Sequence, residues 1–171
     1  MPPPLHVTII GAGLAGLATA RILRDGNHDI TILELLPSNH EVGAALSLGP
    51  SAIYLLEPLG FDRKRCRALT AVGSRTYDKE GRQIHYQDMR PFAVANLADW
   101  LMMHRVELWE ELYRLATAPG HEVGGCGRAA RAFCGAEVVG VDVQSGGVRL
   151  KSGEVIASDL VVGADGIKSM I

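Results

Sequence analysis

The first 34 residues alternate between strand and helix patterns in a way that leaves few possible folds. Residues 7–10 form a short apolar run typical of a buried strand, and residues 14–23 carry apolar side chains at helical spacing. Asp25-Gly26-Asn27 is a helix-stop signal, after which a second apolar strand pattern ends at Glu34. This order predicts a strand–helix–strand unit of a Rossmann-like α/β fold.

The turn between the first strand and the helix has the spacing of a dinucleotide-binding fingerprint. Gly11 is expected to make the tight turn, Gly13 to let the backbone approach a pyrophosphate, and Gly16 to let helix and strand pack closely. Phosphates would then lie at a helix N-terminus, where unpaired N–H groups favour anions. The expected site comprises the whole turn, Gly11, Ala12, Gly13, Leu14, Ala15 and Gly16. The alternative is a glycine-rich turn that binds nothing.

Glu34 ends the second strand, 18 residues after Gly16. A carboxylate there can accept hydrogen bonds from ribose hydroxyls and would repel a 2′-phosphate, which favours FAD or NAD over NADP. The adjacent Leu35 is included in the expected site.

Composition excludes several other classes of function. The chain has 171 residues, a size that suits one domain or one domain with part of another, and its net charge of −2 gives no basic footprint for nucleic acid or an anionic membrane. No apolar run reaches the roughly 18 residues of a membrane span, and no signal peptide is recognisable, so we expect a cytoplasmic protein. Three cysteines without CxxC spacing and six scattered histidines indicate no metal site.

The remaining sequence predicts a mixture of helices and short strands. We expect a helix over 51–59, a β-hairpin from 72–77 and 83–86, and a helix over 100–118 in which Trp109 and Tyr113 belong to the core rather than stacking on a cofactor. Residues 120–134 fit no strand pattern, which indicates either an altered reading frame or a surface loop. An antiparallel meander is expected from Glu137 onward, and a last strand, 160–163, leads into Ala164-Asp165-Gly166.

Four motifs in this order resemble those of the class A flavoprotein monooxygenases, the aromatic-ring hydroxylases of the salicylate and p-hydroxybenzoate hydroxylase type. They are the glycine turn with Glu34, then Glu41-Val42-Gly43-Ala44, then His104-Arg105-Val106-Glu107-Leu108, then the segment 159–169 with its Asp165-Gly166 pair. Together they cover nearly the whole chain. The ordered set is more specific than any one motif.

The resemblance implies a set of cofactor contacts. FAD would be held by the glycine turn and Glu34, by backbone of Gly43, Ala44 and Ala45, and by Arg105, whose permanently charged fork suits the pyrophosphate region. Asp165 and Gly166 would support FAD and the path of NAD(P)H, the co-substrate. Ala45 departs from the family, because many relatives have Gly there.

The resemblance also implies what the chain lacks. The family's second flavin motif, Gly-Asp-Ala-x-His-Pro, does not occur in the sequence. The family's substrate-binding sheet and catalytic side chains also follow that point, so we expect residues 1–171 to be the N-terminal FAD-binding domain of a longer enzyme, incomplete at its C-terminus, with no catalytic residue of its own.

Two functions remain open. In the first, the intact enzyme uses NAD(P)H, FAD and oxygen to hydroxylate an aromatic or polyketide-like small molecule, with the oxygen chemistry belonging to the cofactor. In the second, the chain is a non-catalytic FAD- or nucleotide-binding module. A third reading, an amine-oxidase-like flavoprotein, is disfavoured by the Arg105 and Asp165-Gly166 motifs. The sequence indicates no oligomeric state.

Substitution of Glu34 and Arg105 tests the expected contacts. In the intact enzyme, Glu34→Ala should weaken FAD binding by roughly 1.5–3 kcal/mol, the range for a hydrogen bond to a charged group. Arg105→Ala should have a similar effect and Arg105→Lys a smaller one, because an ammonium lacks the planar fork. Titration of the apoprotein with FAD measures both, and unchanged affinity in Arg105→Ala would remove that residue from the site.

Overall fold

Strand β1 (His6–Ile10), helix α1 (Leu14–Arg24) and strand β2 (Asp29–Glu34) form the predicted strand–helix–strand unit. The structure is a computed structural model that describes residues 3–37, 44–125 and 127–169. The chain divides into two compact units, Met1–Glu41 with Trp109–Ile171, and Val42–Leu108.

The first unit is built on a parallel sheet in which all three partner contacts run the same way. Strand β1 pairs with β2 on one side and with β12 (Leu160–Gly163) on the other, and β2 also pairs with β8 (Arg131–Cys134), giving the order β12-β1-β2-β8. Parallel neighbours bring the carboxyl ends of the strands to one edge of the sheet. The predicted α/β fold class is confirmed.

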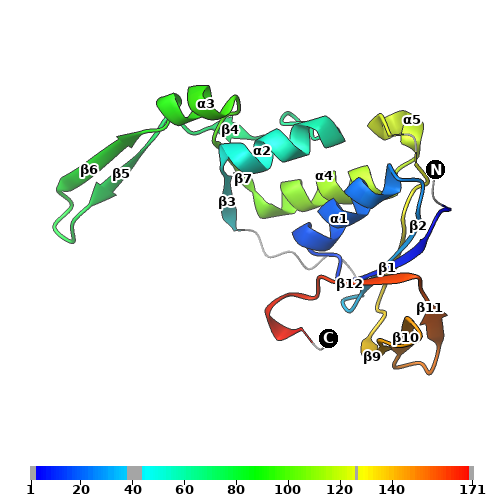
Figure 1. Ribbon diagram of the computed structural model, residues 1–171. Coiled ribbons are helices and arrows are strands. Elements are labelled where there is room, and N and C mark those ends of the chain that lie inside the picture. The colour runs from blue at the N-terminus through cyan, green and yellow to red at the C-terminus, as the bar shows by residue number, and fades with distance from the viewer. Residues whose placement is uncertain (1–2, 38–43, 126, 170–171) are drawn as a thin grey trace. The chain divides into compact units, whose positions relative to one another are not determined.

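Helices and a meander cover opposite faces of this sheet (Figure 1). Helix α1 and the part of α4 (Arg105–Thr117) from Trp109 onward lie on one face, where Val7, Ile9 and Leu17 are fully buried. On the other face, Val148 packs against Ile10 and Leu33. The predicted meander supplies that layer, with strand order β11-β10-β9 from β9 (Val138–Asp142), β10 (Gly147–Leu150) and β11 (Val155–Ala157).

Two arginines of α1 are buried in the core, although the sequence analysis predicted no role for them. Arg21 is 2% exposed and Arg24 is fully buried. The Arg24 guanidinium donates to the carbonyl oxygens of Leu115 and Ala116 at the C-terminal end of α4, at 2.7 and 3.1 Å, and to that of Gly127 at 3.1 Å. A cation at a helix C-terminus satisfies carbonyl groups that have no partner within the helix. Burial, and then the charge of Arg21, lower the pKa of Arg24, whereas Asp25 raises it.

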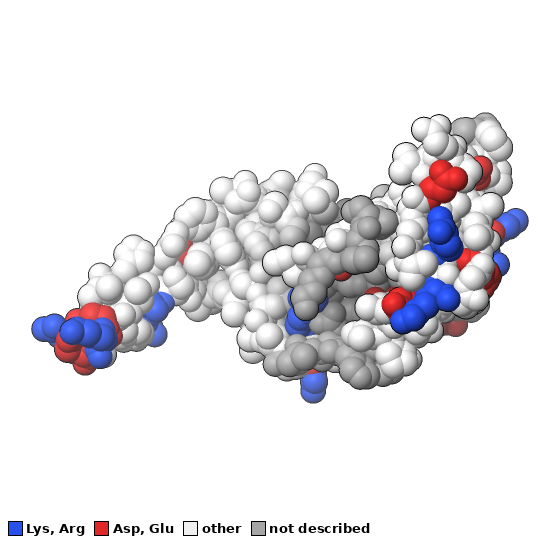
Figure 2. All heavy atoms as spheres, turned by 90° about the horizontal axis from the view of Figure 1, so that it is seen from below, with Lys and Arg blue, Asp and Glu red and all other residues white. Residues whose placement is uncertain are grey.

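The second unit contains a small antiparallel sheet of order β3-β7-β4 and a separate two-stranded hairpin. The predicted hairpin is present as β5 and β6, and the helix expected over 51–59 is α2 followed by a 3₁₀ turn that contains Pro58. At the hairpin tip, Lys79 and Arg82 pair with acidic neighbours, so both signs of charge lie together (Figure 2). The elements are β3 (Ala45–Leu48), α2 (Pro50–Leu56), η1 (Glu57–Leu59), β4 (Leu69–Thr70), β5 (Gly73–Tyr77), β6 (Gln83–Asp88), α3 (Arg90–Asn96) and β7 (Leu101–His104).

The helix predicted over 100–118 is wrong at its start. Leu101 and Met103 are buried while Met102 and His104 are exposed, an alternation of period two that belongs to a strand, and Leu101–His104 is β7. This strand pairs with both β3 and β4, and α4 begins only at Arg105. Hydrogen bonds to two strands outweigh the helical preference of the segment.

The prediction that 120–134 contains no strand is also wrong. Gly120–Val123 forms the short helix α5, and Arg131–Cys134 is β8, which pairs with Thr31–Glu34 of β2. Within this segment a Cβ on Gly127 would lie 1.6 Å from the carbonyl oxygen of Arg24, so the segment packs directly against α1. It is an integral part of the first unit. Among the described helices, none has the length and apolar character needed to cross a membrane.

The three glycines of the turn differ in what a side chain would meet, which gives a matched test of stability. A Cβ on Gly16 would lie 2.0 Å from the carbonyl oxygen of Gly11, whereas a Cβ on Gly13 would meet nothing within 4 Å. Gly16→Ala should therefore destabilise the fold by about 1–3 kcal/mol, the usual cost of overpacking. Gly13→Ala, at the N-cap of α1, should cost less than about 1 kcal/mol. Urea unfolding measures both, and equal losses would show that Gly16 is not needed for helix–strand packing.

Candidate dinucleotide-binding site

The glycine turn lies where the carboxyl ends of three parallel strands meet. Gly11 has φ of +102° and its N–H donates to the carbonyl oxygen of Leu33 in β2 at 2.7 Å. A Cβ on Gly11 would lie 2.4 Å from the carbonyl oxygen of Ala164, which follows β12. The positive φ and the lack of room for a Cβ both require glycine at this position. The predicted roles of Gly11 as the tight turn and Gly16 as the close-packing residue are confirmed.

Gly13 requires a different explanation. Its φ of −69° is one that any residue adopts, and a Cβ there would point into open space. Neither the conformation nor the packing of the described chain therefore calls for glycine here. An open glycine at a helix N-terminus does allow a phosphate to approach the backbone closely.

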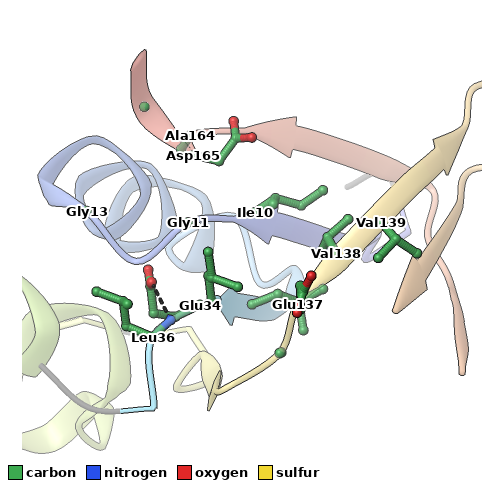
Figure 3. A pocket seen from close by; sticks show the side chains of 14 residues that line it. Ile10, Gly11, Gly13, Glu34, Leu36, Glu137, Val138, Val139, Ala164 and Asp165 are labelled. Atoms are coloured by element: carbon green, nitrogen blue, oxygen red, sulfur yellow. Dashed lines mark hydrogen bonds between the residues drawn. The ribbon is translucent and has the colours of Figure 1, made fainter. Parts of the chain in front are cut away.

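A cavity of about 750 Å³ opens beside this turn (Figure 3). The predicted residues that line it are Gly11, Gly13, Glu34, Leu35, Asp165 and Gly166. They come together because β1, β2 and β12 all end at this edge of the sheet, where open α/β sheets commonly bind ligands. The cavity lies entirely within the first unit, and its volume is in the range of small-molecule sites.

Glu34 has a fixed carboxylate in this cavity. One oxygen, Oε2, accepts a hydrogen bond from the N–H of Ala12 at 2.7 Å, and Oε1 accepts one from the N–H of Leu36 at 2.9 Å, the dashed line in Figure 3. Each carboxylate oxygen has two lone pairs, so both retain acceptor capacity for a hydroxyl. These two hydrogen bonds to backbone amides limit the motion of the carboxylate before a ligand binds. Less conformational entropy is therefore lost when the ligand binds.

One wall of the cavity was not predicted from the sequence. It is largely apolar, it lies beside the end of β2, and it begins where the chain leaves β8. The N–H of Ala136 donates to the carbonyl oxygen of Glu34 at 2.8 Å, which holds this wall against β2. Glu137, at the same place, pairs with Lys151 at 2.8 Å. The lining residues missed by the sequence analysis are Ile10, Leu33, Leu36, Ala136, Glu137, Val138, Val139 and Ala164.

A strand assignment for 131–134 would have revealed this wall. The residues after a third parallel strand arrive at the same edge as the glycine turn, and the sequence analysis assigned no strand there. The missing strand therefore hid the wall.

Four further predicted residues have other surroundings. Ala12 is buried and Leu14 and Ala15 begin α1, and none of the three lines the cavity. Trp109 is half-buried, stacks on Tyr113 at 4.9 Å between ring centroids, and donates its indole N–H to the carbonyl oxygen of Ala12 at 2.7 Å. Trp109 thus contacts the glycine turn as well as the core.

The remaining predicted contacts belong to the second unit. The N–H of Arg105 donates to the carbonyl oxygen of Ala44 at 2.9 Å, and Ala45 pairs with His104 across β3 and β7. The structure therefore brings Ala44, Ala45 and Arg105 together, although they are 60 residues apart in sequence. Gly43 lies outside the described residues, as does Cys126.

Comparison with known proteins agrees with this geometry. A family model described as an FAD binding domain matches residues 4–171. The chain is 34% identical over 167 residues to hispidin-3-hydroxylase from Neonothopanus nambi, and 31% identical over 179 residues to 3-amino-4-hydroxybenzoate 2-monooxygenase from Streptomyces cremeus. The alignments cover 98% of this chain but only 39% and 41% of those relatives, so the chain spans about two-fifths of their length.

Solved structures give the same fold. A mutant of 2-methyl-3-hydroxypyridine-5-carboxylic acid oxygenase superposes with a TM-score of 0.80 over 99% of this chain and 41% of that one, at 23% identity. The family model matches residues 4–171, which is nearly the whole chain. The chain belongs to the FAD binding domain family.

Proposed function

We propose that the cavity of the first unit holds the ADP half of FAD. The glycine turn and the N-terminus of α1 would receive the pyrophosphate, and the Glu34 carboxylate would accept hydrogen bonds from the ribose hydroxyls. Leu35, together with Val138 and Val139 of the apolar wall, would lie along the adenine. The volume and the apolar surface of the cavity fit this group.

The observation that carries the proposal is the open side of Gly13. Gly11 and Gly16 are explained by the protein itself, because a Cβ on either would collide with a carbonyl oxygen. Gly13 has no such explanation within the described chain. Close approach of a ligand accounts for it.

The second unit would supply the remaining contacts. Arg105, with backbone of Gly43, Ala44 and Ala45, would bind FAD, and the Arg105 guanidinium would neutralise pyrophosphate charge. Asp165 and Gly166, at the end of β12, would support the cofactor from the first unit. All of residues 1–171 would then serve as one FAD-binding domain.

We further propose that the protein is a monooxygenase that uses NAD(P)H and oxygen to hydroxylate a small aromatic molecule. FAD, once bound, supplies the electron transfer and the oxygen activation. The described residues bind and orient the cofactor. Support comes from the sequence relatives, which include a hispidin hydroxylase and an aminohydroxybenzoate monooxygenase.

The alternative is a cofactor-binding module without turnover. It is favoured by two of the three carboxylates of the cavity, since the Glu34 carboxylate is bonded to two backbone amides and Glu137 is paired with Lys151. Neither is placed to transfer a proton to a substrate. The two proposals differ in whether FAD, once bound, turns over.

Replacement of Gly13 tests the cofactor site. Gly13→Ala should weaken ADP and FAD at least about tenfold, because the methyl group would occupy the space that the pyrophosphate needs. Gly140→Ala is the matched control, since a Cβ there also meets nothing within 4 Å and Gly140 does not line this cavity. Calorimetric titration of both variants gives the affinities. Wild-type affinity in Gly13→Ala would contradict the proposed phosphate position.

Oxygen uptake separates the two proposed functions. The intact enzyme, loaded with FAD, should oxidise NADH or NADPH faster when a suitable phenol is added, with matching oxygen consumption. A panel of hydroxylated and carboxylated phenols, assayed with each nicotinamide cofactor, provides the measurement. Stoichiometric FAD without any substrate-dependent oxidation across the panel would favour the binding module.

A further inference from the structure

The backbone of Ala12 is held from both sides, at its N–H and at its carbonyl oxygen, by side chains that lie far away in sequence. The N–H of Ala12 donates to Glu34 Oε2 at 2.7 Å, and the carbonyl oxygen of Ala12 accepts from Trp109 Nε1 at 2.7 Å. Ala12 is 4% exposed, and both bonds are partly buried. Hydrogen bonds in such surroundings are stronger than exposed ones.

The Trp109 bond has a geometric consequence for Gly13. The Ala12 carbonyl and the Gly13 N–H belong to one trans peptide plane, in which the two groups point in opposite directions. Fixing the carbonyl toward Trp109 therefore fixes the Gly13 N–H on the opposite side. Gly13 is the N-cap of α1 and lines the cavity.

The donor is itself held in place. The Trp109 ring stacks on Tyr113 with an interplanar angle of 17°, and the same helix is fixed near its C-terminal end by Arg24, which donates to Leu115 and Ala116. An indole N–H has no acceptor function and does not titrate. The bond therefore keeps its direction across the physiological pH range.

We propose that Trp109 is a positioning residue for the pyrophosphate, because its indole N–H sets the direction of the Gly13 amide that faces the phosphate. This inference rests on the proposed FAD site. The Trp109 hydrogen bond orients the turn before the ligand binds, so less conformational freedom is lost on association. Trp109 acts on the phosphate half of the ligand alone, since the ribose and adenine contacts come from Glu34 and the apolar wall.

The test compares ADP with adenosine. Trp109→Phe keeps an aromatic ring over Tyr113 and removes the N–H, so ADP should bind about tenfold more weakly, the effect of one lost buried hydrogen bond. Adenosine, which has no phosphate, should bind within about twofold of wild type. Trp100→Phe is the control, because it removes an indole donor to Ser47 in the other unit. A variant that only loosened the fold would lose both ligands alike.

A nearly isosteric change guards against a misfolded variant. Incorporation of 3-benzothienylalanine at position 109 replaces the N–H by sulfur and keeps the ring size, and the amide resonance of Gly13 in a ¹⁵N–¹H spectrum should shift in this variant. Equal loss of ADP and adenosine, unchanged ADP affinity, or an unmoved Gly13 resonance would overturn the role of Trp109. Failure of the wild-type chain to bind ADP at all would instead contradict the proposed FAD site.

Discussion

Gly11 is the point on which the arrangement of the first unit depends. Its N–H bonds to β2, its Cα faces the carbonyl oxygen of Ala164 after β12, and its own carbonyl oxygen lies against Gly16 of α1. Strand β2, the residue after β12 and helix α1 therefore all contact the chain at this single residue after β1. Any side chain there would separate them, and the residues that line the cavity would no longer share one edge. The position of the Asp165-Gly166 turn follows from the same contact.

The sequence predicted the elements whose burial follows a local period. Strand β1 is buried over four of its five residues and α1 has a clear stop at Asp25, so both could be recognised from neighbouring residues alone. Strands β7 and β8 could not be recognised in this way. Arg131, Phe133 and Cys134 are exposed, because β8 is at an edge of the described sheet and has no apolar face to reveal its period. Leu101–His104 is short and adjoins a helix whose pattern extends over it.

Much of the candidate site was predicted for the same reason. Six predicted residues line the cavity, and they belong to or adjoin motifs of closely spaced residues that can be recognised in the sequence. The apolar wall belongs to no such motif. Its residues Ala136, Val138 and Val139 line the cavity only because they follow β8, which ends at this edge of the sheet. Trp109 has the same character. Helical spacing correctly indicated a packed aromatic residue but could not indicate that its N–H meets Ala12, 97 positions earlier.

The guanidinium of Arg24 links parts of the chain that are synthesised at different times. Its acceptors lie 91, 92 and 103 residues further along, so the strand–helix–strand unit leaves the ribosome well before they exist. At typical elongation rates this interval is about 5–20 s. During this interval the Arg24 guanidinium has no carbonyl partner. An unpaired cation favours exposure to water over burial. The Arg24 guanidinium therefore gains its full set of carbonyl partners only when Gly127 has emerged from the ribosome.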